Sequence, residues 1–234
     1  MCIRDRKYSV GENAETITLQ PGIIGQRVNE ILAPYGRTFT PDPASKKSAM
    51  VGGIVMNNAS GMNCGTHANS DRMLLSARLI LADGTILDTG DEESRKSFLH
   101  SHPSFISRIE QLRDKVNADP SLVERIRYKY GIKNVTGLNL LPLVRFTDPF
   151  DIITHLLVGS EGTLAFGSQF TMRTGHLYPQ SASAMLYFRT MADACNAVKA
   201  MKSQPVFSAE ILDRKSLSSV GDTTCLLYTS QSPR

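Results

Sequence analysis

PDPASKKSAMVGGIVMNNASG, residues 41–61, is the stretch that decides the fold. Gly52 and Gly53 permit backbone angles that are closed to other residues, and they let a ligand approach the peptide N–H groups. The stretch contains no Asp or Glu after Asp42. Backbone donors without nearby carboxylates can cradle an anionic group such as a diphosphate. Taken alone, the same residues also fit an ordinary turn-rich loop.

The composition indicates a folded protein with a sizeable core. A length of 234 residues suits one large domain, or one domain and about half of a second. Of these residues, 41% are hydrophobic. No run of apolar residues is long enough to span a bilayer. The formal net charge of +4 is too small and too dispersed to indicate a nucleic-acid partner.

The cysteines indicate a reducing compartment. Cys2, Cys64, Cys195 and Cys225 lie far apart, without CxxC or CxxxC spacing. This pattern argues against a disulfide framework and against an iron–sulfur site within these residues. The first residues are charged and no apolar region follows them, so no signal peptide is visible.

The two ends of the chain continue neither pattern beside them. Residues 1–6 (MCIRDR) and 225–234 (CLLYTSQSPR) resemble translated sequencing-adapter sequence. We therefore expect residues 1–6 and 221–234 to be non-native ends, and we expect the chain to be part of a longer protein.

Hydrophobic periodicity and turn residues predict an ordered series of elements. A strand at 17–20 ends at Pro21-Gly22, and a short amphipathic helix covers 24–32. Asp83-Gly84 lies between the apolar runs 74–81 and 86–87, which predicts a hairpin. The charge-rich region 91–128 has helical spacing, and Pro103 and Pro120 divide it into two or three helices.

The second half of the chain predicts a loop, a helix, a strand and then a new unit. Residues 131–149 indicate a polar loop, residues 151–158 a helix and residues 164–174 a strand. A strand at 185–188, a helix at 191–201 and a strand at 206–212 would open a β-α-β unit. The expected fold class is α+β.

Two further segments are candidates for contact with a ligand. Gly159-Ser160-Glu161-Gly162 places two glycines around a carboxylate between a helix and a strand. Alone, this pattern is explained equally well by a helix C-cap followed by a turn. Lys133-Asn134-Val135-Thr136-Gly137 lies shortly upstream.

Taken together and in this order, these segments resemble the FAD-binding domain of the vanillyl-alcohol-oxidase, or PCMH-type, flavoproteins. The resemblance is to the branch of D-lactate dehydrogenases, glycolate oxidase D subunits and D-2-hydroxyglutarate dehydrogenases. That branch has the motifs PDPAS, IGG, NAGG or NASG, an ADG hairpin, KNVAGY and VGSEGTLG. This chain has the matching runs at 41–45, 51–53, 58–61, 82–84, 133–137 and 158–164. The resemblance covers about residues 15 to 215, and residues 63–67 look most like long bacterial members that carry a C-terminal iron–sulfur domain.

The resemblance implies FAD as cofactor and a set of residues that would line it. Carried over position by position, these residues are Pro43, Ser45, Gly52, Gly53, Asn58, Ser60, Gly61, Glu161, Gly162, Phe166 and Gly167. The implied domains are a PCMH-type FAD-binding domain at 7–178 and the start of a ferredoxin-like cap, or substrate domain, at 179–220. No metal ligand and no catalytic residue is assigned.

The chain departs from the family pattern in three places. Leu138 stands where the family usually has Tyr, which weakens a substrate role there, and Ala165 replaces the last Gly of GSEGTLG. A Gly-rich phosphate loop should precede Ile17 and is missing, so the FAD-binding domain would be incomplete at its N-terminus. We therefore expect the isolated chain to be inactive and to hold FAD weakly.

Several single residues keep two interpretations. His67 could contact the flavin edge or be a solvated loop histidine, and Lys133 could neutralise flavin or substrate or be a solvated lysine. His100 and His102 form an HxH without a third ligand nearby. His155 is expected to pack or lie at the surface, and Cys64 to be a small loop residue. Asp71 and Arg72 could form a local ion pair.

The implied function is that of an FAD-dependent oxidoreductase. It would oxidise a D-2-hydroxy acid such as D-lactate to the 2-oxo acid by hydride transfer to flavin. Its partners would be the small-molecule 2-hydroxy acid and an electron acceptor, which could be a cytochrome, a quinone or an iron–sulfur domain. A non-catalytic flavin-binding fragment and a UDP-sugar flavin reductase of the same fold are the alternatives. The expected location is the cytoplasm, and the alternative is peripheral binding at the inner face of the membrane.

Overall fold

The computed structural model describes residues 7–219 apart from 62, 136 and 202. Its contacts divide the chain into two compact units, Met1–Pro179 and Gln180–Arg234. The expectations for residues 1–6 and 221–234 lie outside the described residues. The domain assignment made from the sequence stays a prediction, because the geometric division carries no information on function.

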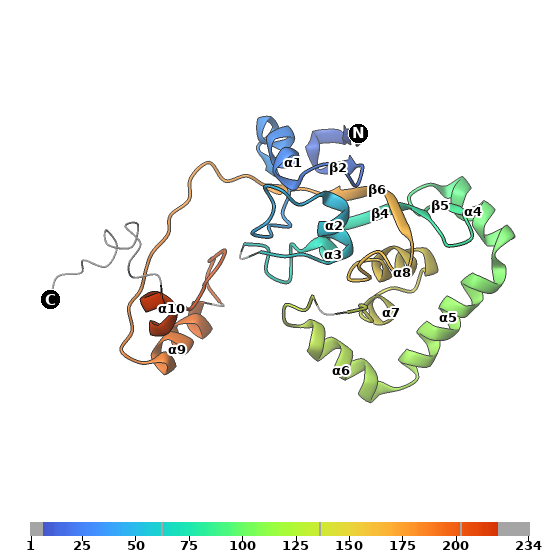
Figure 1. The fold of residues 1–234 in the computed structure, drawn as a ribbon. Coiled ribbons are helices and arrows are strands. Elements are labelled where there is room, and N and C mark those ends of the chain that lie inside the picture. The colour runs from blue at the N-terminus through green and yellow to red at the C-terminus, as the bar shows by residue number, and fades with distance from the viewer. Residues whose placement is uncertain (1–6, 62, 136, 202, 220–234) are drawn as a thin grey trace. The chain divides into compact units, whose positions relative to one another are not determined.

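A five-stranded antiparallel sheet organises the first unit (Figure 1). Its strands lie in the order β1 (Tyr8–Val10), β2 (Thr16–Leu19), β6 (Phe166–Arg173), β4 (Leu74–Ile80), β5 (Ile86–Asp88). The strands expected at 17–20 and 164–174 and the hairpin expected from 74–81 and 86–87 are thus confirmed. The last long strand of this unit is the central one, since β6 pairs with both β2 and β4. A second, two-stranded sheet joins β3 (Arg37–Thr38) to β7 (Gly175–His176).

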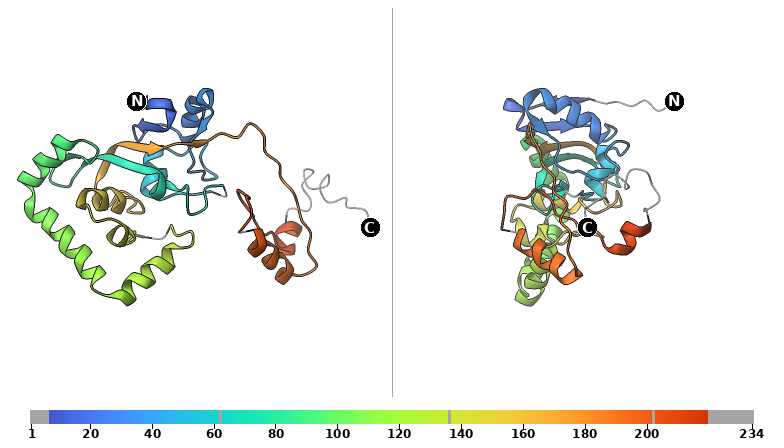
Figure 2. Two further views of the ribbon diagram at one scale, coloured as in Figure 1. Left: turned by 180° about the vertical axis from the view of Figure 1, so that it is seen from behind. Right: turned by 90° about the vertical axis from the view of Figure 1, so that its left-hand side faces the viewer.

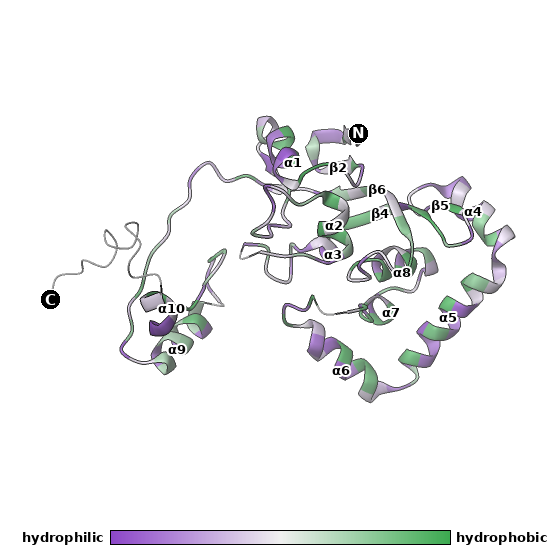
Figure 3. Cartoon of the chain, in the orientation of Figure 1, coloured by the Kyte–Doolittle hydropathy of each residue, from purple (hydrophilic) through white to green (hydrophobic). Residues whose placement is uncertain are grey.

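The main core lies between this sheet and the helices that pack on it. Leu74, Ala77 and Leu79 of β4 are buried, together with Phe170 and Met172 of β6. They pack with buried residues of α1 (Gly25–Leu32), α2 (Val51–Met56) and α8 (Pro149–Leu156). Figure 3 shows the hydrophobic colour concentrated on β4, α2 and α8. The short elements η1 (Glu12–Ala14), η2 (Ala33–Tyr35) and α3 (Ser70–Met73) connect these parts.

Three helices form an arc on one side of the first unit (Figures 1 and 2). They are α4 (Glu92–Ser101), α5 (Pro103–Asn117) and α6 (Pro120–Tyr130), as the two prolines predicted. Asp91 and Asp119 cap α4 and α6 by accepting hydrogen bonds from Ser94 N and Leu122 N. A second small core of Val116, Ile126, Leu143 and Ile152 fills the inside of the arc.

The expectation of a loop throughout residues 131–149 is wrong in one place. Residues Pro142–Arg145 form the short helix α7. Pro142 suits the first helical turn because its missing N–H is not needed there. Leu143 is fully buried in the second core and anchors the turn. The expected helix at 151–158 is confirmed as α8.

The second unit contains helices but none of the expected strands. Met191–Met201 forms helix α9 as predicted, and Arg214–Ser219 forms α10. Residues 185–188 and 206–212, expected as strands, are not in strands. A strand needs a hydrogen-bonded neighbour in register, and no paired strand is present among the described residues after His176. None of the described helices is long and apolar enough to cross a bilayer.

Candidate functional site

The glycine pair lies in a helix, which corrects the interpretation of these residues as a turn-rich loop. Gly52 and Gly53 belong to α2, and neither has a positive φ. Val51, Ile54 and Val55 are buried at helical spacing. Burial of this apolar face outweighs the low helix propensity of two glycines.

The two glycines face different surroundings. The N–H of Gly52 donates to Pro21 O at 2.9 Å, and a Cβ on Gly52 would lie 2.7 Å from Pro21 Cβ. Gly52 therefore permits close packing of α2 on the turn after β2. A Cβ on Gly53 would meet no described atom within 4 Å. Gly53 is the position where the helix leaves its backbone open to a ligand.

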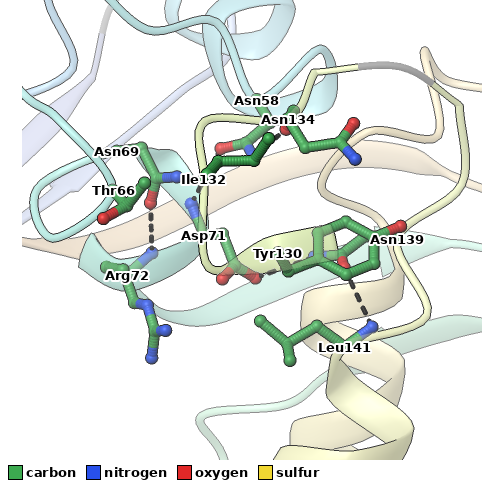
Figure 4. Close-up of a pocket in the computed structure, with 10 residues that line it drawn as sticks. All are labelled: Asn58, Thr66, Asn69, Asp71, Arg72, Tyr130, Ile132, Asn134, Asn139 and Leu141. Atoms are coloured by element: carbon green, nitrogen blue, oxygen red, sulfur yellow. Dashed lines mark hydrogen bonds between the residues drawn. The ribbon is translucent and has the colours of Figure 1, made fainter. Parts of the chain in front are cut away.

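Three segments that the sequence singled out separately meet at the C-terminal end of α2. Met56 O accepts hydrogen bonds from Gly159 N at 2.7 Å and from Glu161 N at 3.1 Å. A Cβ on Gly159 would lie 2.9 Å from Gly137 O, so Gly137 packs against the turn at 159–162. Asn58 Nδ2 donates to Asn134 O at 3.5 Å (Figure 4).

The segment at 41–45 joins the same site from another side. A Cβ on Gly61 would overlap Asp42 O, so the two backbones are in direct contact. Asn63 Nδ2 donates to Asp42 Oδ2 at 2.8 Å, and Lys46 forms an ion pair with the same carboxylate. Burial opposes the ionisation of Asp42, but the hydrogen bonds from Lys46 and Asn63 outweigh it and hold the pKa below its usual value.

The turn at 159–162 presents backbone toward the open side of the site. Gly159, Glu161 and Gly162 have φ values of 92°, 53° and 78°. Glu161 is a non-glycine residue in the left-handed region, which is uncommon and marks a constrained turn. Glu161 is exposed, and a Cβ on Gly162 would meet no described atom within 4 Å. The turn is fixed by its hydrogen bonds to Met56 and open outward.

Ser60 has a buried hydroxyl without a partner. Within the described part of the chain, Ser60 Oγ is inaccessible and makes no hydrogen bond. An unsatisfied buried hydroxyl is costly, and such a group in a folded protein calls for a ligand, an ion or a water. Ser60 lies between Asn58 and Gly61, at the convergence point of the segments.

The remaining residues predicted to line the cofactor lie around this centre. Pro43 O accepts from Lys46 N at 2.9 Å, and the exposed Ser45 accepts from Ser48 N and Ala49 N at 2.8 Å each. The two residues thus shape the turn before α2. Phe166 is exposed at the start of β6, whereas Gly167 is buried, and its Cβ position lies 2.9 Å from Met56 Cε.

Sequence reasoning missed a buried polar network beside the site. Asp71 is 4% exposed and pairs with Arg145, not with the neighbouring Arg72, at 2.7 Å from Oδ2 to Nη1. Asn139 Nδ2 donates to Asp71 Oδ1 at 3.2 Å, and Asp71 N donates to Asn58 Oδ1 at 3.2 Å (Figure 4). No local sequence signal pointed to this network, because Asn69, Ser70 and Asp71 are all polar and only the structure shows that they are buried.

His155 is buried next to this network. Its Nδ1 lies 2.8 Å from Asp151 O, to which it donates, and its ring packs at 4.4 Å from that of Phe146. Burial lowers the pKa of His155 below its usual value, and the nearby Arg145 guanidinium acts in the same direction. The neutral imidazole is therefore favoured.

Other candidates have structural partners. Lys133 Nζ donates to Gly61 O at 3.1 Å, which links the 133–137 segment to the end of residues 41–61. Cys64 is buried, and its thiol donates to Gly61 O. His102 stacks on Phe98 and contacts Asp83. His67 is exposed.

The site can be compared with known proteins. Residues 5–90 match the family model of an FAD binding domain. D-2-hydroxyglutarate dehydrogenase of Haemophilus influenzae is 25% identical over 214 residues, which cover 86% of this chain and 20% of the relative. D-lactate dehydrogenase of Archaeoglobus fulgidus is 27% identical over 180 residues, 76% of this chain and 28% of the relative. The glycolate oxidase subunit GlcD of Escherichia coli is 30% identical over 74 residues, 32% of this chain and 15% of that subunit.

The fold is also found among solved structures. An alkyldihydroxyacetonephosphate synthase structure superposes with a TM-score of 0.50 at 19% identity, covering 86% of this chain and 27% of that one. The chain therefore covers only 20% of the first dehydrogenase, 28% of the second and 27% of the synthase.

The residues present fit the cofactor that this family model implies. The open backbone at Gly53 and Gly162 and the unsatisfied hydroxyl of Ser60 suit a ligand with several hydrogen-bonding groups. Residues 5–90 thus match an FAD-binding domain of the PCMH type, and the distant relatives of the chain include D-2-hydroxyglutarate dehydrogenases, D-lactate dehydrogenases and a glycolate oxidase subunit.

Proposed function

We propose that this chain is the cofactor-binding part of an FAD-dependent oxidoreductase of the 2-hydroxy-acid dehydrogenase group, with a D-2-hydroxy acid such as D-lactate as substrate. The observation that supports this most strongly is the convergence at the end of α2, where residues 41–61, 133–137 and 158–164 meet. The names of the relatives supply the class of substrate.

The proposed roles of the residues follow from their surroundings. Gly53 and Gly162 would let the cofactor approach the backbone, and the Ser60 hydroxyl would hydrogen-bond to it. Pro43, Ser45, Gly52, Asn58, Gly61, Glu161, Phe166 and Gly167 complete the proposed cofactor-binding set. FAD, when bound, supplies the acceptor for the hydride that leaves C2 of the hydroxy acid.

We assign no catalytic base. His155 is unsuited because it is buried and its Nδ1 donates to Asp151 O within its own helix. We propose that residues 179–220 begin a ferredoxin-like cap that carries substrate-binding groups. A cytochrome, a quinone or an iron–sulfur domain would take the electrons.

Cofactor binding is the test suited to this chain, because it spans so little of its relatives. FAD is titrated into the purified chain and into Gly53→Val and Ser60→Ala, with flavin fluorescence as the readout. Gly53→Val should weaken binding by at least about tenfold, or about 1.4 kcal/mol, because the side chain would fill the space for the ligand. Ser60→Ala removes one hydrogen bond and should weaken binding by about 0.5–1.5 kcal/mol.

Ser104→Val is the matched control, since Ser104 is exposed on α5, outside the segments that meet at the site. It should bind FAD as the unaltered chain does. Gly53→Val should also keep its thermal stability without FAD, because its Cβ enters open space among the described residues. Equal FAD affinity in the unaltered chain and in Gly53→Val would contradict the proposed site.

A further inference from the structure

The most heavily hydrogen-bonded side chain near the site is the buried carboxylate of Asp71. Arg145 donates to Asp71 through Nη1 at 2.7 Å to Oδ2 and through Nη2 at 3.3 Å to Oδ1. Arg145 Nη2 also lies 3.3 Å from the backbone O of Asp71. Asn139 supplies a further donor to Oδ1. Arg145 thus holds both the side chain and the main chain of Asp71.

Asp71 in turn holds Asn58. The N–H of Asp71 donates to Asn58 Oδ1 at 3.2 Å, while Asn58 Nδ2 reaches Asn134 O. Asn58 is buried and has a φ of 49°. A residue other than glycine is uncommon in the left-handed region, even though Asn tolerates it better than most, and its surroundings must hold it there. The side chain of Asn58 provides this fixation at the point where the chain leaves α2 for Ser60 and Gly61.

Stability alone is a weak explanation for this pair. A buried ion pair must overcome a large desolvation cost, and apolar residues of similar size often serve the fold equally well. A pair that connects α3, α7 and the end of α2 instead fixes the relative positions of three segments. Bidentate geometry makes that connection directional.

We propose that Asp71 and Arg145 are positioning residues for the cofactor: they hold Asn58, and through it the backbone at residues 58–61 and at Asn134, in the arrangement that accepts FAD. This inference rests on the proposed function. It goes further by assigning a role to two residues that do not line the cofactor in the proposed set.

The test separates positioning from stability. FAD affinity, unfolding free energy and hydrogen exchange at 58–61 and 133–139 are measured for Asp71→Asn, Arg145→Lys and the apolar double variant Asp71→Leu with Arg145→Met. Asp71→Asn should weaken FAD binding by at least about tenfold, within the usual range of coupling between sites. Arg145→Lys keeps the positive charge but loses the guanidinium that donates to both carboxylate oxygens of Asp71. Its affinity for FAD should therefore lie between those of the unaltered chain and Asp71→Asn.

The double variant discriminates most sharply. Apolar replacement of a buried pair can restore stability. We expect its unfolding free energy to recover relative to Asp71→Asn, while FAD affinity stays low and exchange at 58–61 stays fast. Recovery of both stability and affinity would overturn the positioning role, because the pair would then serve the fold alone.

A remote ion pair provides the control. Arg95 and Asp148 are in contact at 3.0 Å between helices α4 and the start of α8, away from the convergence point. Asp148→Asn should lower stability without changing FAD affinity more than about twofold. If the unaltered chain fails to bind FAD, the proposed function fails and this inference with it. If the unaltered chain and Asp71→Asn bind FAD equally, only this inference fails.

Discussion

Gly52 and Gly53 are neighbours in sequence with opposite structural roles. A Cβ on Gly52 would lie 2.7 Å from Pro21 Cβ, whereas a Cβ on Gly53 would enter open space among the described residues. Gly52→Ala should therefore lower the unfolding free energy by about 1–3 kcal/mol through overpacking. Gly53→Ala should raise it by about 0.5–1 kcal/mol, because alanine is the better helix former.

Urea denaturation of the two variants, in the absence of FAD, checks this contrast. Each variant is the control for the other, since both make the same chemical change in α2. Equal effects of the two substitutions would show that the packing of α2 on Pro21 is not as described.

A second prediction at the residue scale concerns pH. Burial depresses the pKa of His155 below its unfolded value of 6.5, so between the two pKa values the unfolded state binds more protons. The contribution of the neutral His155 side chain to the free energy of unfolding is complete above the pKa of the unfolded state. It is lost as the pH falls toward the pKa of the folded state. The slope is at most about 1.4 kcal/mol per pH unit.

Unfolding free energies between about pH 8 and about pH 5 measure this effect. His155→Gln should show a shallower loss of stability on acidification than the unaltered chain. His67→Gln, at an exposed histidine, is the control and should leave the slope unchanged. The same acid dependence in His155→Gln as in the unaltered chain would refute the assignment.

At the scale of elements, the helical arc depends on local capping. The arc's terminal helix α6 contributes one buried residue, Ile126, to the small second core. Its cap Asp119 accepts from Leu122 N at 3.1 Å. Asp119→Ala should cost about 1 kcal/mol, and this loss should appear as exchange about fivefold faster in residues 120–130.

Asp91→Ala is the matched control, because Asp91 caps α4 in the same way at 2.9 Å. It should speed exchange in α4 and leave α6 unchanged. Faster exchange of the central strands β4 and β6 in Asp119→Ala would show that the arc unfolds only together with the sheet, contrary to expectation.

At the scale of the whole molecule, the two units differ in how much they bury. Both hydrophobic cores lie in the first unit, and no described residue of 180–219 is buried. Met185, Tyr187, Phe188 and Met191 are exposed instead. Because burial of apolar surface is the main stabilising contribution, the second unit should open far more readily than the first.

Hydrogen exchange followed by mass spectrometry tests this difference within the intact chain. Amides of α9 should exchange at least about a hundredfold faster than those of β4 and β6. Comparable protection of α9 and β4 would mean that the apolar residues of the second unit are covered in solution.

The sequence by itself determined the features that depend on neighbouring residues. The hairpin at Asp83-Gly84, the breaks at Pro103 and Pro120 and the amphipathic helix at 24–32 are confirmed, because turn chemistry, proline and helical periodicity act within a few residues. The order of the glycine-rich segments also indicated the FAD-binding domain. The residues that line the cofactor stay a prediction.

Only the tertiary structure decided which remote residues meet. It made Gly52 and Gly53 part of a helix, because buried neighbours outweigh glycine's propensity. It inserted β6 between β2 and β4, and it paired Asp71 with an arginine 74 residues away rather than with the adjacent Arg72. The strands expected at 185–188 and 206–212 did not form for the same reason, because a strand also needs a remote partner. Strand pairing and buried ion pairs depend on which distant surfaces come together, and that information is not contained in any local stretch of the chain.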